Sequence, residues 1–556
     1  MALHPSVVAR LERLAPDQRA AATAPPGPIL CVAPAGSGKT TTLVARVAWL
    51  IASGAAPPES IVAITFNRRA AEELAERLAS ALEPLGLAGG PEAVRVRTFH
   101  ALGLEVLRDA GERVEPLVDR LELLRRLLPD AGPPVWRRLD TAFSRLKLDL
   151  GVTAEEVGTD ADPGPVARAF LAYEAELAAE GGLDFDDLVA RCLRLLEGDP
   201  RVLARWRARA TDLLVDEAQD LDRAQLRLAL LLAAPANRIF LVGDDDQSIY
   251  GWRLADVRRV LGLANVLPGL RRVDLVVNYR CPATVVQRAV RLVEHNQARF
   301  AKTIRAGPTA AGPVVLAADA ADEPVRMARI LDRWSATEGT RAILARTNRE
   351  LLPPIAVALE AGVPFRPPPV ELLIGSPDVD ACLDAVADDR APVGTPLVAR
   401  IESVRVGWAA DSPHSAADPE MPARVDIAAA VLAWAAPFAT LEELRAAIAA
   451  RRADLARLCT EDAPLTFATA HATKGLEFDH VAVIGMDAGR FPSGRSLADA
   501  PDPGRALEEE RRLAYVAWTR ARRSLTLVYD PASPSRFLLE AFEPAELGLE
   551  EERRRA

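Results

Sequence analysis

The side chains best suited to chemistry lie in the segment GSGKT, residues 36–40, which follows an apolar run and precedes a helical pattern. Glycine-rich turns of this kind aim several backbone N–H groups at one anion, and the next helix adds its positive N-terminal end. In such a loop Lys39 reaches the β- and γ-phosphates of a nucleotide, and the hydroxyl of Thr40 ligates Mg²⁺. The alternative is a glycine turn that only packs a helix against a sheet. Ala33 departs from the general pattern, which has its first glycine there.

Two adjacent carboxylates, Asp216 and Glu217, follow the apolar run at residues 213–215. A carboxylate at the end of a buried strand can hold Mg²⁺, usually through water, which makes Asp216 the candidate metal ligand. Glu217 beside it can orient and deprotonate an attacking water. Gln247 follows a second apolar run, 239–242, and could sense the γ-phosphate. Adjacent acids are common on surfaces, so the phosphate loop upstream is what gives this pair its meaning.

Aromatic side chains next to a cation form a third group. Tyr250 and Trp252 lie on one short stretch with Arg253, and Phe66 follows another predicted strand. Aromatic rings beside a cation suit the stacking of bases of a single-stranded nucleic acid. The alternative for all three rings is packing in a hydrophobic core.

Three polar side chains have a plain structural interpretation when each is taken alone. Gln18 precedes the loop and could present its amide to adenine, but an isolated helical glutamine is more typical of the surface. His100 alone is typical of a capping or packing histidine. Arg520 lies on a helix whose other face is apolar, so a surface charge is the simpler interpretation.

These groups require strands that end beside them. Short apolar runs predict buried strands, and spacings of three and four residues predict amphipathic helices. A helical pattern without a catalytic constellation runs from about residue 104 to 183 and indicates an insertion, and a second α/β region begins near Asp274. The predicted strands are 29–32, 61–66, 94–98, 213–215, 239–242, 342–348, a strand–turn–strand at 466–485, and 524–529; the main predicted helices are 41–51, 70–82 and 507–523.

Composition limits the class of protein. The 556 residues are too many for one hydrophobic core, so two or more domains are expected. No apolar run reaches the ~20 residues of a membrane span, and the N-terminus lacks a signal-peptide core. The five cysteines are scattered, which argues against structural zinc and disulfides and favours a reducing cytoplasm. The net charge of −10 does not advertise a nucleic-acid binder, although an acidic chain can still contain a basic groove.

The ordered segments APAGSGKT, AITF, TFHAL, DFDDL, LLVDEAQD, VGDDDQSIYGWR, LVVNYR, ATKGLEFDHVAVIG and YVAWTRA resemble the UvrD/Rep/PcrA group of superfamily 1 DNA helicases. The resemblance runs from about Gln18 to Arg523 and is far more specific than a lone phosphate loop. It implies an α/β fold with two RecA-like parallel-sheet domains of the P-loop NTPase type, which carry helical insertions. It also implies 3′-to-5′ movement along single-stranded DNA, driven by hydrolysis of ATP in the cleft between the two domains.

The same resemblance implies a domain organisation. The first RecA-like domain, 1A, is interrupted by the helical insertion 1B, and the second, 2A, is interrupted by an accessory insertion, 2B. The expected segments are 1–104 and 184–270 for 1A, 105–183 for 1B, 271–366 and 459–545 for 2A, 367–458 for a reduced 2B, and 546–556 for a charged tail.

Roles for individual residues also follow from the resemblance. Gln18 and Tyr279 would contact adenine, Glu217 would be the general base, and Arg280 and Arg520 would reach the γ-phosphate as arginine fingers. The catalytic set is Lys39, Asp216, Glu217, Gln247, Arg280 and Arg520, and the metal ligands are Thr40 and Asp216. The nucleotide-binding set is Gln18, Ala35, Gly36, Ser37, Gly38, Lys39, Thr40, Thr41, Arg46, Tyr279, Arg280, Glu477 and Arg520. The DNA-binding set is Phe66, His100, Tyr250, Trp252 and Arg253.

The chain departs from the family pattern at three places. The usual TFTNKAA is TFNRRAA here, which changes the side chains at Asn67 and Arg68, and the usual WRGA has a leucine, Leu254, in place of glycine. The largest departure is the segment between AILARTN and ATAHATKGLEF, which is short and shows no glycine hairpin of the kind that grips duplex DNA in 2B. Unwinding is therefore less secure than ATP hydrolysis and translocation.

We therefore expect a cytoplasmic, ATP- and Mg²⁺-dependent DNA helicase or translocase in DNA repair or replication restart. Its partners would be single-stranded DNA and junctions between single strands and duplex, with no membrane and with any protein partner unknown. One alternative is a single-strand translocase that strips proteins and unwinds little. Another is a nucleotide-switched, DNA-binding partner of a nuclease, which would not need both a general base and two arginine fingers.

Overall fold

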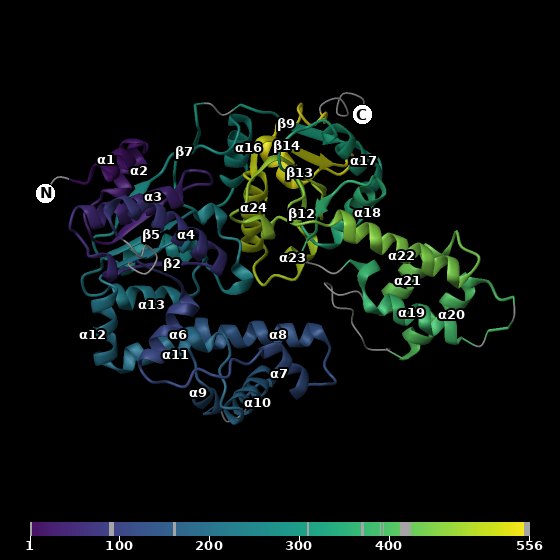
Figure 1. Ribbon diagram of the computed structural model, residues 1–556, viewed down its shortest axis with the longest axis horizontal. Helices are drawn as coiled ribbons and strands as arrows, with labels where there is room; N and C mark the ends of the chain where they lie inside the picture. Colours follow the sequence, from purple (N-terminus) through teal and green to yellow (C-terminus); the bar gives the residue numbers. More distant parts are fainter. Residues whose placement is uncertain are drawn as a thin grey trace. The chain divides into compact units, whose positions relative to one another are not determined.

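The computed structural model describes residues 3–87, 94–159, 163–308, 311–368, 372–389, 391–392, 394–411 and 424–549 (Figure 1). The chain forms two compact units. The first contains residues 1–131, 136–311 and 502–519, and the second contains 132–135, 312–501 and 520–556. Among the described residues, no helix is both long enough and apolar enough to cross a membrane.

The first unit is built on a six-stranded sheet in which all neighbouring strands run parallel, in the order β3-β2-β4-β5-β1-β6. An all-parallel sheet with crossover helices is the α/β architecture that the sequence predicts. The strands are β1 (Ile29–Val32), β2 (Ile61–Thr65), β3 (Arg95–Thr98), β4 (Asp212–Val215), β5 (Ile239–Gly243) and β6 (Arg271–Asp274).

Successive side chains of these strands enter two different hydrophobic cores. In β1, Leu30 and Val32 belong to one core, whereas Ile29 and Cys31 belong to the other. Because both faces of the sheet are covered, its strands are apolar at nearly every position. Helices on the Leu30 face include α6 (Phe99–Asp109), α11 (Asp187–Gly198), α12 (Pro200–Arg209) and α13 (Arg223–Ala233); those on the Ile29 face are α1 (Pro5–Glu12), α2 (Pro16–Ala22), α3 (Lys39–Ala52) and α4 (Arg68–Leu82).

The boundary expected at residue 271 is not a boundary between the compact units. Strand β6 pairs with β1 in the first sheet, and the first unit continues to Ala311. The unit also takes in α24 (Pro503–Trp518), which packs on α16 (Ala283–Val293) and which the sequence placed in the second half of 2A. The reason is direct hydrogen bonding and helix packing, which a single sequence does not reveal. The other elements here are η1 (Pro58–Ser60), η2 (Glu83–Leu85), α14 (Val257–Leu261), α15 (Leu263–Val266), β7 (Val277–Asn278) and β8 (Arg305–Ala306).

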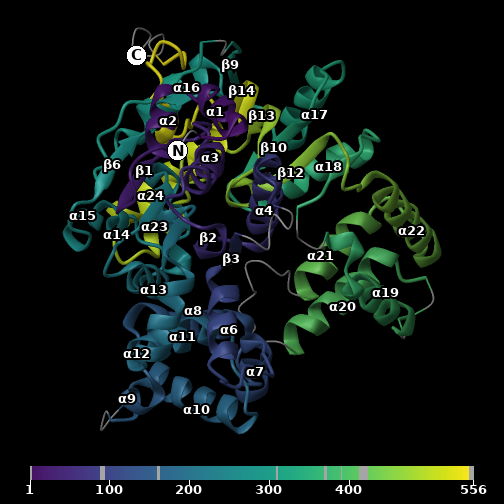
Figure 2. The ribbon, with the colours of Figure 1, turned by 60° about the vertical axis from the view of Figure 1, so that its left-hand side comes forward.

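The helical insertion of the first unit has a small core of its own, formed by Leu123, Leu124, Leu139, Phe143, Phe170, Tyr173 and Leu177. Figure 2 shows its helices next to α6 and α11. Its elements are α7 (Arg120–Leu127), α8 (Pro133–Ser144), the π-helix η3 (Arg145–Leu150), α9 (Ala154–Gly158) and α10 (Pro165–Ala179).

The second unit contains another six-stranded, all-parallel sheet, in the order β11-β12-β10-β13-β14-β9. Two such sheets confirm the predicted α/β fold class. The strands are β9 (Val314–Ala318), β10 (Arg341–Ala345), β11 (Phe365–Arg366), β12 (Leu465–Thr469), β13 (Phe478–Val483) and β14 (Ala521–Tyr529). The flanking elements are α17 (Glu323–Trp334), η7 (Arg349–Leu351), α18 (Leu352–Glu360), η9 (His471–Thr473), α23 (Gly494–Ala498) and α25 (Arg536–Ala541).

Between β11 and β12, the described residues of the second unit form helices joined by loops. Twelve buried residues from its four main helices form a separate core, which includes Val379, Leu383, Ile401, Val431 and Leu444. The elements are η8 (Leu373–Gly375), α19 (Pro377–Asp388), α20 (Leu397–Asp411), α21 (Arg424–Ala435) and α22 (Leu441–Leu458).

Candidate functional site

The predicted phosphate loop lies between β1 and α3, which confirms the strand–loop–helix expectation. Gly36 and Gly38 have φ values of 66° and 82°, in the left-handed region that favours glycine. A Cβ at Gly36 would lie 2.6 Å from Oδ1 of Asn278, and a Cβ at Gly38 would lie 2.6 Å from Nε2 of Gln18. Both glycines are therefore required by conformation and by close neighbours.

Residues predicted to contact adenine lie next to this loop. Gln18 is buried and donates from Nε2 to the carbonyl of Ser37 at 2.8 Å, so the surface interpretation of Gln18 is wrong. The backbone N–H of Tyr279 donates to the carbonyl of Gly36 at 2.9 Å, and its phenol ring is exposed. Arg280 follows, with Nη1 3.3 Å from the carbonyl of Thr519.

Arg46, which the resemblance assigns to the nucleotide, has structural partners. Its Nη1 donates to the carbonyls of Ala21, Ala22 and Ala24, and the guanidinium lies 4.8 Å from the centre of the Phe240 ring. Burial lowers the pKa of Arg46 to about 10. The side chain therefore joins α3 to the end of α2 within the core.

Lys39 and Glu217 form an ion pair, with Nζ 3.0 Å from Oε2. Burial by itself lowers the pKa of Lys39, but Glu217, Asp244 and Asp216 outweigh that effect and raise it. The ammonium is therefore charged at neutral pH, as contact with phosphate requires. The pair brings the predicted phosphate ligand and the predicted base together from positions 178 residues apart.

Glu217 is held in an uncommon backbone conformation, with φ of 52°. Such strain in a non-glycine residue is typical of functional sites. Gln219, in the turn η4 (Ala218–Asp220), donates from Nε2 to Oε2 of Glu217 at 2.6 Å. Its Oε1 accepts from the backbone N–H of Asp244 at 3.0 Å. Gln219 thus links the two acidic segments; the sequence interpretation missed it, although it lies within the quoted motif LLVDEAQD.

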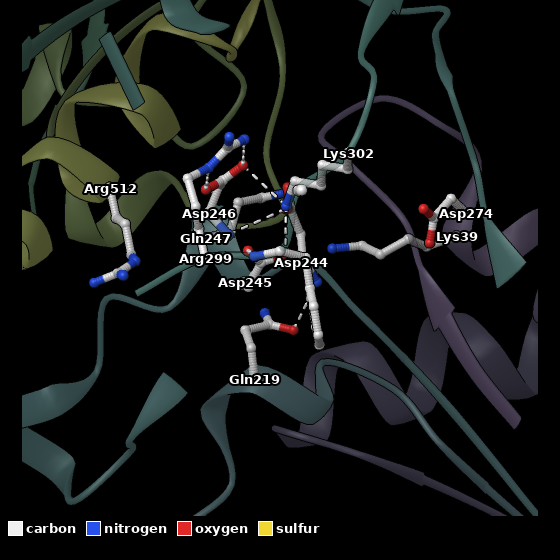
Figure 3. A network of polar contacts seen from close by, with 12 residues as sticks. Lys39, Gln219, Asp244, Asp245, Asp246, Gln247, Asp274, Arg299, Lys302 and Arg512 are labelled. Atoms are coloured by element: carbon white, nitrogen blue, oxygen red, sulfur yellow. Dashed lines mark hydrogen bonds and ion pairs between the residues drawn. The ribbon is translucent and has the colours of Figure 1, made fainter. Parts of the chain in front are cut away.

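Gln247 belongs to a buried polar network in the turn η5 (Asp245–Gln247), shown in Figure 3. Its Nε2 donates to Oδ2 of Asp244 at 2.7 Å, and Oδ1 of the same aspartate accepts from Nζ of Lys302 at 2.9 Å. Lys302 also contacts Asp245 and Asp246, and Arg299 pairs with Asp246 at 2.8 Å. Nearly complete burial of the three aspartates and Lys302 makes this ionic network the support of Gln247.

Three of the predicted DNA-contact residues form one aromatic group. The rings of Phe66 and Tyr250 stack at 4.9 Å, and the ring of Trp252 meets Tyr250 edge-on at 6.2 Å. Trp252 is 56% exposed, so it is not the core aromatic of the alternative interpretation. The guanidinium of Arg253 lies 4.6 Å from the Trp252 ring centre. We call Phe66, Tyr250, Trp252 and Arg253 the first aromatic platform.

His100 belongs to a second aromatic platform, together with Phe185. The two rings stack at 3.9 Å with 18° between their planes, and Phe185 is 59% exposed. Burial lowers the pKa of His100 to about 4, so its ring is neutral at pH 7. The sequence interpretation did not single out Phe185, and the available signal was its place in the segment DFDDL.

The loop that carries the first aromatic platform includes the turn η6 (Gly251–Arg253) and is fixed by two backbone features. The N–H of Gly251 donates to Oε1 of Glu509 in α24 at 2.8 Å, and a Cβ at Gly251 would lie 2.4 Å from Oε2. Leu254, which replaces the usual glycine, has φ of 67°. Its side chain packs against the hydrophobic core on the Leu30 face of the sheet, which we call the first core. The backbone at this position thus has the left-handed conformation that suits glycine.

Two predicted nucleotide contacts lie in the second unit. Arg520 is 1% exposed and donates from Nη1 to the carbonyl of Leu476 at 3.1 Å, so the surface-charge interpretation of Arg520 is wrong. Glu477, which directly follows Leu476, is exposed, and its Oε1 lies 3.5 Å from Nη1 of Arg522. Arg520 and Glu477 are thus neighbours within this unit.

Comparison with known proteins identifies two family matches along the chain. Residues 14–268 match the family described as UvrD/REP helicase N-terminal domain, and residues 436–531 match the UvrD-like helicase C-terminal domain. The chain is 29% identical to DNA helicase II of Escherichia coli strain K12, over 93% of this chain and 84% of that protein. It is 30% identical to ATP-dependent DNA helicase UvrD2 of Mycobacterium bovis (94% and 80%) and 27% identical to ATP-dependent DNA helicase PcrA of Leuconostoc citreum (90% and 80%).

Proposed function

Because the chain belongs to the UvrD/Rep family of DNA helicases, we propose that it moves 3′-to-5′ along single-stranded DNA and hydrolyses ATP as it moves. It is an ATP-dependent DNA helicase of the UvrD/PcrA type. The observation that carries the proposed chemistry is the arrangement of Lys39, Glu217 and Gln219 beside the phosphate loop. Direction, role in DNA repair or replication restart, and a cytoplasmic location are further parts of the proposal that rest on the resemblance.

The phosphate loop would bind the nucleotide through backbone N–H groups and Lys39. A γ-phosphate on Lys39 would compete with Glu217 for the ammonium, which would leave the carboxylate able to accept a proton from water. Gln219 would keep that carboxylate in place, since it holds Oε2 at 2.6 Å. Gln247 would report the presence of the γ-phosphate to the loop that carries the first aromatic platform.

The residues present fit Mg²⁺, which the family implies. Thr40 lies in the first turn of α3, and Asp216 follows β4 with its N–H bonded to the carbonyl of Ile64 at 2.8 Å. A hydroxyl and a carboxylate are hard oxygen donors, and Mg²⁺ in such sites keeps water and phosphate as its remaining ligands. The ion would neutralise charge on the β- and γ-phosphates.

Other residues would complete nucleotide binding. Gln18 and Tyr279 would contact adenine, which their positions beside the loop support. Arg280 of the first unit and Arg520 of the second would stabilise charge on the transferring phosphoryl group, and Glu477 would link the nucleotide to the second unit. Arginine fingers of this kind typically contribute ~10³ to 10⁵ in rate.

Single-stranded DNA would bind on the two aromatic platforms. Each platform has one exposed ring, Trp252 in the first and Phe185 in the second, that leaves a face or an edge free for a base, and Arg253 adds a cation next to Trp252. Phosphate contacts would make binding salt-sensitive. Junctions between single strands and duplex would be the natural substrates of such a site.

The proposed chemistry is tested by Glu217→Gln. The variant should bind ATP and DNA but lose ~10² to 10⁴ of its DNA-stimulated turnover, because the general base is gone. Glu73→Gln, which makes the same change at an exposed carboxylate of α4 that pairs with Arg77, serves as the matched control and should keep turnover within about twofold. Turnover of Glu217→Gln at the wild-type rate would remove Glu217 from the mechanism.

Direction and unwinding are tested by strand displacement with 3′-tailed and 5′-tailed duplexes. We expect displacement only from the 3′-tailed substrate. A second candidate, a translocase that strips proteins and unwinds little, is favoured by one observation: the described residues between β11 and β12 form helices, joined by loops, that have a compact core of their own. ATP-driven movement on single strands with no displacement of either duplex would support that candidate.

A further inference from the structure

The second aromatic platform sits on a turn whose flanking residues are buried carboxylates. Phe185 is exposed, but Asp184 and Asp187 around it are almost completely buried. The N–H of Asp187 donates to Oδ1 of Asp184 at 2.9 Å, and the N–H of Asp184 donates to Oδ2 of Asp187 at 3.2 Å. We call residues 184–187 the DFDD turn. These reciprocal bonds fix its backbone, so the direction of the Phe185 side chain follows from where the aspartates are held.

The groups that hold the aspartates come from the helical insertion. Arg120 is central, because its Nη2 lies 2.7 Å from Oδ2 of Asp184 and 2.7 Å from Oδ2 of Asp186, one residue on each side of Phe185. The remaining donors are Lys147 to Asp184 at 2.8 Å and to Asp187 at 3.0 Å, the Tyr173 hydroxyl to Asp184 at 2.7 Å, and the Ser144 hydroxyl to Asp186 at 2.5 Å. Elements α7, α8, η3 and α10 thus each contribute to the DFDD turn.

The charges of this network are locked by mutual pairing. Burial alone would lower the pKa of Arg120 and raise that of Asp184, but their attraction reverses both shifts: the pKa of Arg120 is raised and that of Asp184 is held well below its usual range. Arg120 uses all three of its nitrogens: Nη2 meets Asp184 and Asp186, Nε also donates to Asp184, and Nη1 donates to the Asp140 carbonyl and the Ser144 hydroxyl. A single ammonium does not offer donors spread over a rigid fork of this size. Arg120 is 8% exposed, so it is poorly placed to touch a DNA phosphate itself.

We infer that Arg120 is a positioning residue for single-stranded DNA: it acts through Asp184 and Asp186 to hold the Phe185 ring where a base can stack. The inference rests on the proposed function, in which Phe185 contacts bases. The helical insertion would thus contribute to binding of single-stranded DNA through Arg120 without contacting the DNA through that residue. It also accounts for the four polar donors, Arg120, Lys147, Tyr173 and Ser144, that an insertion with a small hydrophobic core of seven buried residues contributes to one turn.

The test is a double-mutant cycle of Arg120→Lys and Phe185→Leu on the full-length protein, read as affinity for fluorescent oligothymidylate. Phe185→Leu should weaken binding by about tenfold, because stacking on one base is lost. Arg120→Lys should weaken binding several-fold in the wild-type background. In the Phe185→Leu background it should change binding less than twofold, since the ring that it positions is already gone. ATP turnover without DNA should stay unchanged in Arg120→Lys, because Arg120 lies outside the phosphate loop and outside both aromatic platforms.

Asp140→Asn is the matched control. Its carboxylate pairs with Nη1 of the same Arg120 at 3.1 Å, but the side chain is 41% exposed and lies outside the DFDD turn. It should therefore leave affinity within twofold. All assays run below the melting range of the least stable variant, and Ser144→Ala, which removes one donor to Asp186, replaces Arg120→Lys if that protein does not fold.

Each outcome decides the matter. Equal losses from Arg120→Lys in both backgrounds would show a direct or general structural effect and overturn the inference, while the proposed function stands. Unchanged affinity in folded Arg120→Lys would also overturn the inference and leave the proposed function standing. Wild-type affinity of Phe185→Leu would overturn stacking at Phe185 and the inference with it, and absence of single-strand binding by the wild-type protein would overturn the proposed function itself.

Discussion

The Lys302 network and the Arg120 network both hold a tight turn in place through buried ion pairs, but they use different side chains. Each buries a cation among aspartates that follow one another on a tight turn, and each turn carries or precedes an exposed aromatic group. At Lys302 an ammonium meets three consecutive aspartates that are shielded from solvent, and Arg299 pairs with the last of them, Asp246. At Arg120 the guanidinium and the ammonium of Lys147 both pair with Asp184, and the hydroxyls of a tyrosine and a serine donate further hydrogen bonds to the aspartates. Asp244 and Asp245 pair with Lys302, whereas Asp184 pairs with both Arg120 and Lys147, so the first network depends more on one side chain.

The strongest way to break this comparison is Lys302→Met, set against Arg120→Met. Removal of one partner from a buried ion pair typically costs ~3–5 kcal/mol, because a charge is left buried and uncompensated. We expect the free energy of unfolding to fall further for Lys302→Met, since Lys147 still neutralises Asp184 in the other variant. Urea unfolding of the two proteins gives the measurement.

Its control is Arg68→Met, which removes a helical ion pair on the surface between Arg68 and Glu72. Exposed pairs contribute ~0 to 1 kcal/mol, so this variant should unfold almost as the wild type does. Equal losses for Lys302→Met and Arg68→Met would mean that the Lys302 network does not stabilise the first unit.

Trp252→Ala asks whether the first aromatic platform grips DNA as the second is proposed to do. Affinity for single strands should fall by one to two decades, because base stacking on an aromatic contributes ~1–3 kcal/mol. Trp49→Ala, in a helix of the same unit, is a control for loss of a large aromatic outside the platform. The measurement is anisotropy with labelled oligonucleotide, and equal affinity for wild type and Trp252→Ala would remove the ring from the binding site.

Asp184 and Asp245, one aspartate from each network, should also respond to pH in opposite directions. Burial raises the pKa of Asp245, with Asp246 and Asp244 adding to the rise, whereas Lys147 and Arg120 hold the pKa of Asp184 low despite its burial. An unfolded aspartate titrates near ~3.9. The contribution of Asp184 to stability is thus full above about pH 4 and lost as pH falls through its depressed pKa. The contribution of Asp245 is greatest below about pH 4 and declines as pH rises through its raised pKa.

Urea midpoints of Asp184→Asn and Asp245→Asn, each compared with wild type from acid to neutral pH, measure the two slopes. The urea midpoint of Asp184→Asn should lie below that of the wild type at neutral pH, and this difference should shrink in acid. The difference between Asp245→Asn and wild type should shift in favour of the variant as pH rises above about 4. If the differences in urea midpoint changed with pH in the same direction for both variants, the opposite pKa shifts of Asp184 and Asp245 would be contradicted.

The smallest effect is expected from Gly251→Ala, which displaces the carboxylate of Glu509 from the loop of the first aromatic platform. The added Cβ would fall 2.4 Å from Oε2, so the hydrogen bond to residue 251 cannot keep its geometry. We expect a few-fold loss of DNA-stimulated ATP turnover with normal folding, since one ordinary hydrogen bond contributes ~1 kcal/mol. Glu509→Gln, which keeps an acceptor for the N–H of Gly251, should retain turnover.

The sequence predicts the parts of the site that depend on local order. The strand–loop–helix around Lys39 and the carboxylates after β4 follow from apolar runs, glycines and spacing within a few residues. Two parallel sheets also follow, since repeated strand–helix patterns favour them. The resemblance supplied the role proposed for Arg520, which local patterns alone did not distinguish from a surface charge.

The supporting networks could not be predicted, because their partners are far apart along the chain. Arg120 and Asp184 are separated by 64 positions and Lys302 and Asp245 by 57. A lone arginine or lysine in a helical or loop pattern has the signature of a solvated charge, and burial becomes visible only when the carboxylates meet it. The position of α24 in the first unit was missed for the same reason: its packing on α16 has no local signal.

Leu254 has a consequence for how the first aromatic platform opens. The backbone there holds a left-handed conformation that costs a leucine roughly 1–2 kcal/mol, and the same side chain packs against the first core. The loop can therefore relax its backbone only by withdrawing an apolar group from that core, so local opening becomes coupled to disruption of the sheet's own packing. A glycine at this position would let the loop fray alone. Amide hydrogens of the loop, including those of Arg253 and Leu254, are bonded to carbonyls within it. They should exchange with solvent on the slow timescale of the core rather than on that of a surface turn.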